Sequence, residues 1–169
     1  MIRLFHHPRG FRGIVGDPEE KEVGRVDLAL FGDRAEIVGT VICGDGYYGE
    51  HMEEARAECL KLIGAFKPDL LVAGPGFNAG RYGVACGDVC AEAGKALGIP
   101  TVTALYPENP GVELYAKKTV VVQAADSARG MKAALEGMAN VFRTTQQYTE
   151  LGQVLLRRAD AATSPSKAP

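Results

Sequence analysis

Asp69-Leu-Leu-Val-Ala73 leads directly into the glycine-rich stretch Gly74-Pro-Gly-Phe-Asn-Ala-Gly-Arg-Tyr-Gly-Val-Ala-Cys-Gly87. A helical pattern follows from Val89 to Leu97, and Gly98 is placed to end it. A short, continuous apolar run before a glycine-rich stretch is typical of a strand that is buried on both faces. The sequence therefore predicts a strand, a loop and a helix in succession, and open α/β sheets bind their ligands at such loops.

Upstream of this stretch, the sequence predicts two strands and a helix. Val26–Phe31 and Glu36–Ile42 are strand-like runs separated by the turn signal Gly32-Asp33-Arg34, which indicates a hairpin or one irregular strand pair. Apolar residues at spacings of three and four predict an amphipathic helix over Glu50–Phe66. Pro68 stops that helix, because proline disfavours helical backbone at the residue before it.

Downstream, Pro100–Leu105 and Thr119–Gln123 are predicted strands, and Ser127 is placed to cap a last helix. The apolar stripe of that helix is formed by Met131, Ala134, Leu135, Met138 and Phe142. Because helices alternate with buried strands, the sequence predicts an α/β fold, a three-layer sandwich with a mostly parallel, doubly wound sheet.

Length and composition limit the class of protein. The 169 residues fit a single α/β domain over residues 1–160, followed by a disordered tail over 161–169 that is rich in Ala, Ser and Pro. A net charge of −2 argues against a nucleic-acid partner. No apolar run approaches the roughly 18 residues that cross a bilayer, and the first residues do not form a secretory signal, so no membrane partner is expected. Four cysteines without a disulfide-rich composition favour the cytoplasm.

Three loops are predicted to meet at the carboxyl edge of the sheet. They are Cys43–Gly49, Gly74–Gly87 and Tyr106–Gly111, and all three are rich in glycine, aromatic and polar residues. The loops at the opposite edge are plain connections, so the asymmetry indicates a functional edge. Glycines of the central loop are expected to adopt positive φ or to let backbone N–H groups approach a ligand. These loop glycines are Gly74, Gly76, Gly80, Gly83 and Gly87.

Arg81 is the strongest candidate for substrate binding. Its guanidinium is able to hold a carboxylate through two parallel hydrogen bonds, and the alternative is a surface salt bridge. Asp45 either accepts a hydrogen bond from a ligand amine or stabilises its own turn. Asn78 either orients the same ligand or serves a left-handed turn. Further candidates from the three loops are Tyr47, Tyr82, Glu108 and Asn109.

Two of the four cysteines are candidate catalytic thiols. Cys43 follows a strand and Cys86 lies in the glycine-rich stretch, where neighbouring N–H groups would favour a thiolate. The alternative for each is a small buried hydrophobic residue. Cys59 and Cys90 fall on helical patterns and are expected to be shielded. We expect a thiol reagent to label Cys43 or Cys86 first.

Metal and nucleotide sites find no support in the sequence. The histidines are His6, His7 and His51, and their spacing brings no ligand set together, so no metal is expected. The chain contains neither a phosphate-binding lysine motif nor the G-x-G-x-x-G motif. A small molecule without a nucleotide is therefore the expected ligand.

Three segments resemble the N-terminal part of the selenoprotein B subunit of glycine, sarcosine and betaine reductases. They are Thr40-Val-Ile-Cys-Gly-Asp-Gly-Tyr47, Pro68–Gly87 and Gly98–Val112, and the flanking segments Phe11–Lys21 and Ser127–Met131 are also similar. The resemblance covers about residues 5–145. It implies an α/β domain that binds a small substrate with an amino or carboxylate group, in an enzyme that cleaves a C–N or related C–S bond reductively.

The resemblance also implies where the redox chemistry lies. In that family a pyruvoyl-containing subunit activates the amine, and a selenocysteine in a C-terminal part displaces it. No cysteine follows Cys90 in this chain. The resemblance therefore implies no cofactor here, and a pyruvoyl group, selenocysteine or thiol on a partner subunit. Two hypotheses stand: a subunit of an oxidoreductase that acts with a second polypeptide or as a homo-oligomer, or a non-catalytic binding or assembly module.

Overall fold

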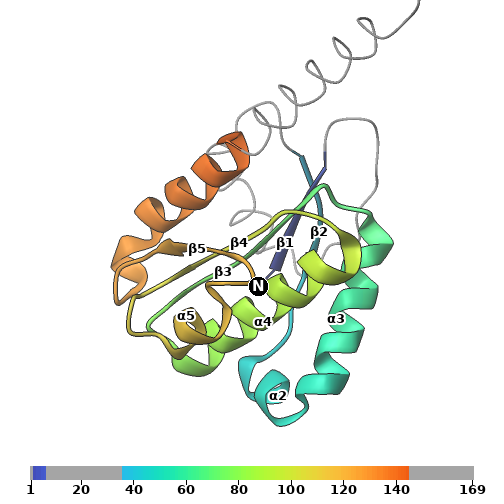
Figure 1. The fold of residues 1–169 in the computed structure, drawn as a ribbon, viewed down its shortest axis with the longest axis horizontal. Helices are drawn as coiled ribbons and strands as arrows, with labels where there is room; N and C mark the ends of the chain where they lie inside the picture. The colour runs from blue at the N-terminus through green and yellow to red at the C-terminus, as the bar shows by residue number, and fades with distance from the viewer. Residues whose placement is uncertain (1, 7–35, 145–169) are drawn as a thin grey trace, which may run out of the picture.

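The computed structural model describes residues 2–6 and 36–144, whose strands form one five-stranded sheet in the order β2-β1-β3-β4-β5 (Figure 1). Strands β3, β4 and β5 run parallel, whereas β1 is antiparallel to both of its neighbours. The strands are β1 (Ile2–His6), β2 (Glu36–Val41), β3 (Leu70–Phe77), β4 (Thr101–Leu105) and β5 (Val120–Gln123).

Helices connect the parallel strands and cover both faces of the sheet, which confirms the predicted α/β sandwich (Figure 1). A short 3-10 turn, η2 (Ala128–Gly130), precedes a helix over residues 131–144. The other helices are α2 (Asp45–Glu50), α3 (Met52–Phe66), α4 (Gly80–Leu97) and α5 (Pro110–Tyr115).

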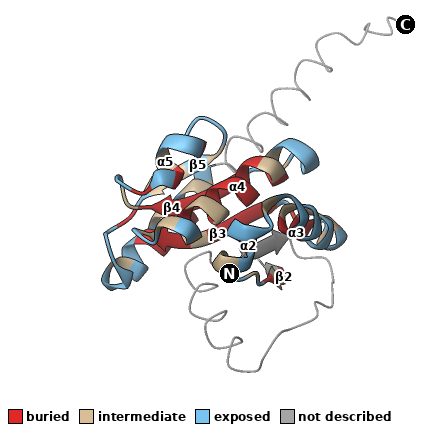
Figure 2. Cartoon of the chain, turned by 90° about the horizontal axis from the view of Figure 1, so that it is seen from below, coloured by how far each residue is buried: buried red, intermediate tan, exposed pale blue. Residues whose placement is uncertain are grey.

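The residues of β3 divide the core into two layers. Leu71 and Ala73 pack in a cluster with the buried residues of α3 and α4. Leu70 and Val72 pack in a second cluster with the buried residues of helix 131–144. Because successive side chains of a strand point to opposite faces, these two clusters lie on opposite sides of the sheet. Strand β4 is buried at every residue, and most residues of β3 and the middle of α4 are buried as well, as Figure 2 shows.

Strand β1 lies in the interior of the sheet, although no sequence pattern predicted a strand there. Ile2 pairs with Val41 of β2 on one side and with Ala73 of β3 on the other. Five residues are too few for a clear alternation, and the two partner strands are far along the chain. The predicted strand Val26–Phe31 and the predicted tail over 161–169 lie outside the described residues.

The prediction that Gly74–Gly87 forms a single loop was wrong. Strand β3 continues to Phe77, and α4 begins at Gly80, so only two residues separate them. The predicted loop Cys43–Gly49 is also partly helical, since it contains most of α2. The strand β2, helix α3 and strands β4 and β5 lie within two residues of their predicted bounds.

Close helix packing, rather than a loop, accounts for two of the glycines in this stretch. A Cβ on Gly83 would lie 2.3 Å from the Asn109 side chain, and one on Gly87 would lie 2.5 Å from the Tyr115 ring. Gly74 has a φ of 90°, at the irregularity where β3 leaves its regular pairing with β4. Glycine is therefore required here by packing and by one backbone turn.

Across residues 2–6 and 36–144, none of the helices is both long and apolar enough to span a bilayer.

Candidate functional site

The carboxyl edge of the parallel strands carries a small cavity, here called the Arg81 groove. Its volume is about 320 Å³, and it is bordered by α2, α4 and the starts of α3 and α5. The lining residues are Tyr48, Gly49, Met52, Gly80, Arg81, Val84, Ala85 and Pro110. Apart from Arg81, the side chains at this groove are apolar or aromatic, so a single cation stands at the rim of an otherwise apolar hollow.

Arg81 and Asp45 face each other in a loose ion pair. The Nε atom of Arg81 lies 3.9 Å from Oδ2 of Asp45, and the two side chains are 73% and 46% exposed. That separation is too long for a hydrogen bond, so both groups keep free hydrogen-bonding capacity. The structure thus brings together two of the predicted substrate-binding residues, one from the first turn of α4 and one from the first turn of α2.

The turn before α4 is held in an uncommon backbone conformation. Phe77 has a φ of 47°, in the left-handed region, which costs a side-chain-bearing residue about 1–2 kcal/mol. Its carbonyl oxygen accepts hydrogen bonds from Tyr106 N and from Asn109 Nδ2, both at 3.0 Å. These contacts fix the turn from which Arg81 projects.

Asn109, a predicted substrate-binding residue, lies in the interior with 2% exposure. Its Nδ2 atom also donates to Ala79 O at 3.2 Å, and its Oδ1 atom accepts from Gly111 N at 2.8 Å, which caps α5. Both ends of the amide are engaged by the backbone. The structure therefore corrects the expectation: Asn109 joins the β3–α4 turn to the start of α5 and does not face the groove.

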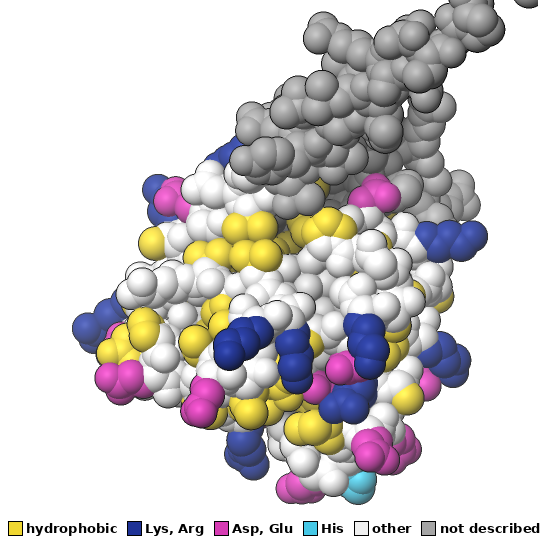
Figure 3. Space-filling view, in the orientation of Figure 1, with side chains coloured by type: hydrophobic (Ala, Val, Ile, Leu, Met, Phe, Trp, Pro, Cys, Tyr) yellow, Lys and Arg dark blue, Asp and Glu magenta, His cyan; other side chains and the backbone are white. Residues whose placement is uncertain are grey.

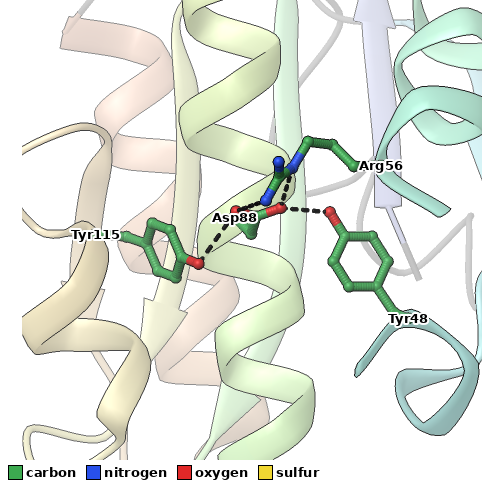
Figure 4. Close-up of polar contacts among 4 residues, drawn as sticks. All are labelled: Tyr48, Arg56, Asp88 and Tyr115. Atoms are coloured by element: carbon green, nitrogen blue, oxygen red, sulfur yellow. Dashed lines mark hydrogen bonds and ion pairs between the residues drawn. The ribbon is translucent and has the colours of Figure 1, made fainter. Parts of the chain in front are cut away.

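A buried carboxylate lies at the centre of a polar network among four helices (Figure 4). Asp88 of α4 is 3% exposed and accepts hydrogen bonds from Arg56 Nε at 2.7 Å and Arg56 Nη2 at 2.9 Å. Tyr48 OH donates to it at 2.7 Å and Tyr115 OH at 3.1 Å. Because Tyr48 also lines the Arg81 groove, this network fixes one wall of the groove.

The network raises the pKa values of its two tyrosines and of Arg56. Burial and the Asp88 charge raise the pKa of Tyr115 to about 12. Burial and the hydrogen bond to Asp88 raise the pKa of Tyr48 still further. The hydrogen bond to Asp88 also raises the pKa of Arg56. Both tyrosines are therefore neutral donors, and Arg56 is a cation, across the physiological pH range.

Sequence reasoning missed this network. Its hydrogen bonds join residues 27 to 40 positions apart, and no spacing rule connects them. One signal was present: Asp88 interrupts a run of small and apolar residues that ends at Ala91. A lone acid on the inner face of a helix needs a buried partner.

A second cavity, here called the Cys43 groove, lies between the end of β2 and helix α3. Its volume is about 590 Å³. Cys43 is half-buried here, and Tyr47 is 49% exposed with its ring 4.8 Å from the His51 ring. Partial burial and Glu54 raise the pKa of Tyr47. The lining residues are Val41, Ile42, Cys43, Gly44, Tyr47, Glu54, Ala55, Ala57, Glu58, Cys59 and Leu62.

The expectation that Cys86 is an accessible thiol was wrong. Cys86 is 2% exposed in the core, and burial raises its pKa to about 11, so the thiol stays protonated near neutral pH. Cys90 is fully buried, with Sγ 3.5 Å from Val102 O, and burial raises its pKa further. Cys59 is also buried, as expected. Cys43 is the most accessible of the four thiols.

The remaining predicted residues are dispersed around the edge. Tyr82 is half-buried and packs against the core cluster on the α4 side. Asn78 and Glu108 are exposed and line neither groove. Figure 3 shows one face of the molecule, where Lys and Arg side chains are interspersed with Asp and Glu over the region of α3 and α4.

Similarity to known proteins identifies the family of this chain. Residues 17–156 match the family model described as glycine/sarcosine/betaine reductase selenoprotein B (GRDB). The chain is 45% identical over 162 residues to a glycine reductase complex component B subunit gamma of Carboxydothermus hydrogenoformans. It is 41% identical over 151 residues to a sarcosine reductase complex component B subunit beta of Peptoclostridium acidaminophilum.

The likeness covers most of this chain but a minor part of each relative. The matched regions are 89% of the chain and 37% of the first relative, and 83% of the chain and 35% of the second. The chain thus spans little more than a third of the length of the curated relatives it matches. No solved structure matches it. The family match extends over more than half of the chain, and the protein belongs to the glycine/sarcosine/betaine reductase selenoprotein B family.

Proposed function

We propose that this protein is a subunit of a reductase complex that acts on a small amino acid of the glycine, sarcosine or betaine type. In this proposal the chain binds the substrate in the Arg81 groove, and a partner subunit supplies the group that cleaves the C–N or a related C–S bond. The observation that carries the proposal is that Arg81 lines this groove and forms a loose pair with Asp45 beside it.

The charges of Arg81 and of the adjacent Asp45 suit a substrate that carries both a carboxylate and an amine. A guanidinium binds a carboxylate through two parallel N–H···O bonds, and a carboxylate such as Asp45 accepts from an ammonium group. Because their mutual contact of 3.9 Å is long and both are well exposed, little energy is lost when a ligand comes between them. The apolar walls formed by Met52, Val84 and Pro110 suit the methyl groups of N-methylated substrates.

The redox step is assigned to a partner. Cys86 and Cys90 are buried and have raised pKa values, so neither supports a nucleophile at the Arg81 groove. We therefore propose that a pyruvoyl group, a selenocysteine or a reactive thiol belongs to a second chain, and that this chain holds no cofactor. The names of the relatives, which are component B subunits of glycine and sarcosine reductase complexes, support a protein partner.

The partner is tested by purifying the tagged chain from its native cell and measuring intact masses. We expect a second polypeptide in a fixed ratio, carrying a pyruvoyl group, a selenocysteine or a reactive thiol. A stable monomer that recovers no partner from cells would contradict the subunit assignment.

The substrate site is tested with Arg81→Lys in the purified complex, titrated with glycine, sarcosine and betaine. Lysine keeps the charge but lacks the planar fork, so affinity should fall by about 1–3 kcal/mol while the melting temperature stays unchanged. Arg129→Lys, an exposed arginine outside both grooves, is the matched control. If the complex forms and Arg81→Lys keeps full affinity, the chain is an assembly module rather than a substrate-binding subunit.

A further inference from the structure

The Cys43 groove contains two cysteines from different parts of the chain. Cys43 follows β2 and is half-buried, whereas Cys59 lies on the inner side of α3 and is 3% exposed. Both line the groove, and Cys43 packs against the core cluster to which Cys59 belongs. An accessible thiol thus lies beside a shielded one at the wall of an open cavity.

The two thiols also interact electrostatically. Burial raises the pKa of Cys59 to about 11, and the neighbouring Cys43 side chain adds to that rise. Both side chains line the same groove. A shielded thiol with a raised pKa is a poor first nucleophile in solution, but it is well placed to attack a sulfur held next to it.

We propose that Cys43 and Cys59 form a redox-active dithiol that reacts with small disulfides entering the Cys43 groove. The Cys43 thiolate attacks one sulfur of the small disulfide, forms a mixed disulfide and releases one small thiol. Cys59 then loses its proton and attacks the Cys43 sulfur, which forms the Cys43–Cys59 disulfide and releases the second small thiol. In sum, one small disulfide is reduced to two thiols while the protein dithiol is oxidised, so that atoms and electrons balance.

The charges at the groove select among small disulfides. Glu54 and Glu58 line it, and the Lys61 ammonium, 3.4 Å from Glu58, offsets part of their charge. The remaining negative potential attracts cations and repels anions. A cationic disulfide such as cystamine should therefore react with Cys43 several-fold faster than the anionic oxidised glutathione, and added salt should reduce that difference.

This inference goes beyond the proposed reductase function, because it concerns another groove and needs neither the substrate nor the partner. It is tested on the purified full chain, treated with cystamine under native conditions, quenched with acid and analysed by mass spectrometry. We expect a transient cysteamine adduct, followed by a product lighter than the reduced chain by two hydrogen atoms. Trypsin cuts after Arg34, Arg56 and Lys61, so the product should contain the peptides 35–56 and 57–61 joined by a disulfide.

Variants separate the two steps. Cys59→Ser should keep the cysteamine adduct on Cys43, because the resolving thiol is missing. Cys43→Ser should leave Cys59 unmodified on the same time scale, and Cys86→Ala, which changes a core cysteine outside the groove, should behave as wild type. The wild-type peptide map does not depend on how well any variant folds. A persistent adduct in the wild-type chain, a disulfide that includes Cys86 or Cys90, or no reaction at all would each overturn the proposal.

Discussion

At the scale of single residues, Asp88 organises the interior beneath the Arg81 groove. A carboxylate that is 3% exposed needs donors, and the network gives it four hydrogen bonds from three side chains. Its partners come from α2, α3 and α5, while Asp88 itself belongs to α4. One side chain therefore holds four helices in a fixed arrangement, and the groove wall at Tyr48 depends on it.

Replacing Asp88 by asparagine should destabilise the fold strongly. The asparagine amide has nearly the same shape as the carboxylate but no charge. The partly buried guanidinium of Arg56 would therefore lose its counter-ion. Loss of one partner of a buried pair costs about 3–5 kcal/mol, and the 28% exposure of the Arg56 side chain places the expected loss near 3 kcal/mol. Urea unfolding measures this loss of stability. The control is Glu136→Gln, which breaks an exposed ion pair with Lys132 and should cost under about 1 kcal/mol. Equal effects of the two variants would mean that Asp88 is not the centre of the network.

The two network tyrosines should make the fold sensitive to alkaline pH. The pKa of Tyr115 is raised to about 12, and that of Tyr48 is raised as well, whereas an unfolded tyrosine ionises near pH 10. The unfolded chain therefore releases these protons first, so stability is complete below about pH 10 and falls as the pH rises towards 12.

Phenolate absorbance measured during an alkaline titration checks this expectation. Tyr48 and Tyr115 should ionise only when the protein unfolds, whereas the exposed Tyr47 should ionise without unfolding. In Tyr115→Phe, stability should be lower at neutral pH and should depend less steeply on pH between about 10 and 12. Ionisation of all tyrosines in the folded protein would contradict the buried hydrogen bonds to Asp88.

Candidate site residues could be predicted from the sequence only where they lie in short polar segments. Arg81 and Asp45, which lie 3.9 Å apart, were chosen because each stands among glycines in a predicted loop, and their binding role stays a prediction. Asp88 and Tyr115 were not found, because 27 positions separate them and their contact depends on how α5 packs on α4. Cys86 was misplaced for the same reason, since the chain folds it inward as part of a helix.

At the scale of elements, α4 and α5 approach each other at glycine positions of α4, where no side chain keeps the helices apart. Gly83 lies against the Asn109 amide and Gly87 against the Tyr115 ring. Residues four positions apart share a face of a helix, so this pair makes a flat strip on which α5 and its preceding turn pack. Two of the glycines that suggested a ligand-binding loop are explained here by this contact between helices.

Substituting Gly87 by alanine should separate the two helices. The new Cβ would lie 2.5 Å from Cδ2 of Tyr115, whose ring is held by the hydrogen bond to Asp88. We expect a loss of about 1–3 kcal/mol, the range for overpacking, although alanine is the better helix former. Gly46→Ala is the matched control in α2, because nothing lies within 4 Å of its Cβ, and it should be neutral or stabilising by up to about 1 kcal/mol. Chemical unfolding of both variants measures the difference, and a stabilising Gly87→Ala would contradict the close contact.

Elements were predictable where periodicity was clear. The strand Leu70–Ala73 and the helix now seen as Met52–Phe66 follow from apolar spacing alone. The extension of β3 to Phe77 was not predictable, because Gly74, Pro75 and Gly76 favour a turn in any local rule. In the folded protein, hydrogen bonds from Tyr106 and Asn109 to Phe77 hold that segment beside β4.

At the scale of the whole molecule, one sheet with helices on both faces places Arg81 and Asp45 at its carboxyl edge, whereas Cys86 lies in the core. The layered α/β architecture was predictable, since alternating strand and helix patterns allow few other arrangements. The antiparallel part of the sheet was not, because the pairing of β1 with β2 and β3 depends on segments distant in the sequence. Both grooves lie where α2 and α3 adjoin the rest of the fold.

The interior position of β1 has a consequence for how each new copy of the protein is made. Residues 2–6 are translated well before their second neighbour, which is complete only once Ala73 has been added. Until then the nascent chain presents backbone groups that end up paired on both sides, and such distant pairings form slowly. Translation speed through residues 36–73, and the chaperones that bind the emerging chain, should therefore affect how much of this protein reaches its folded state.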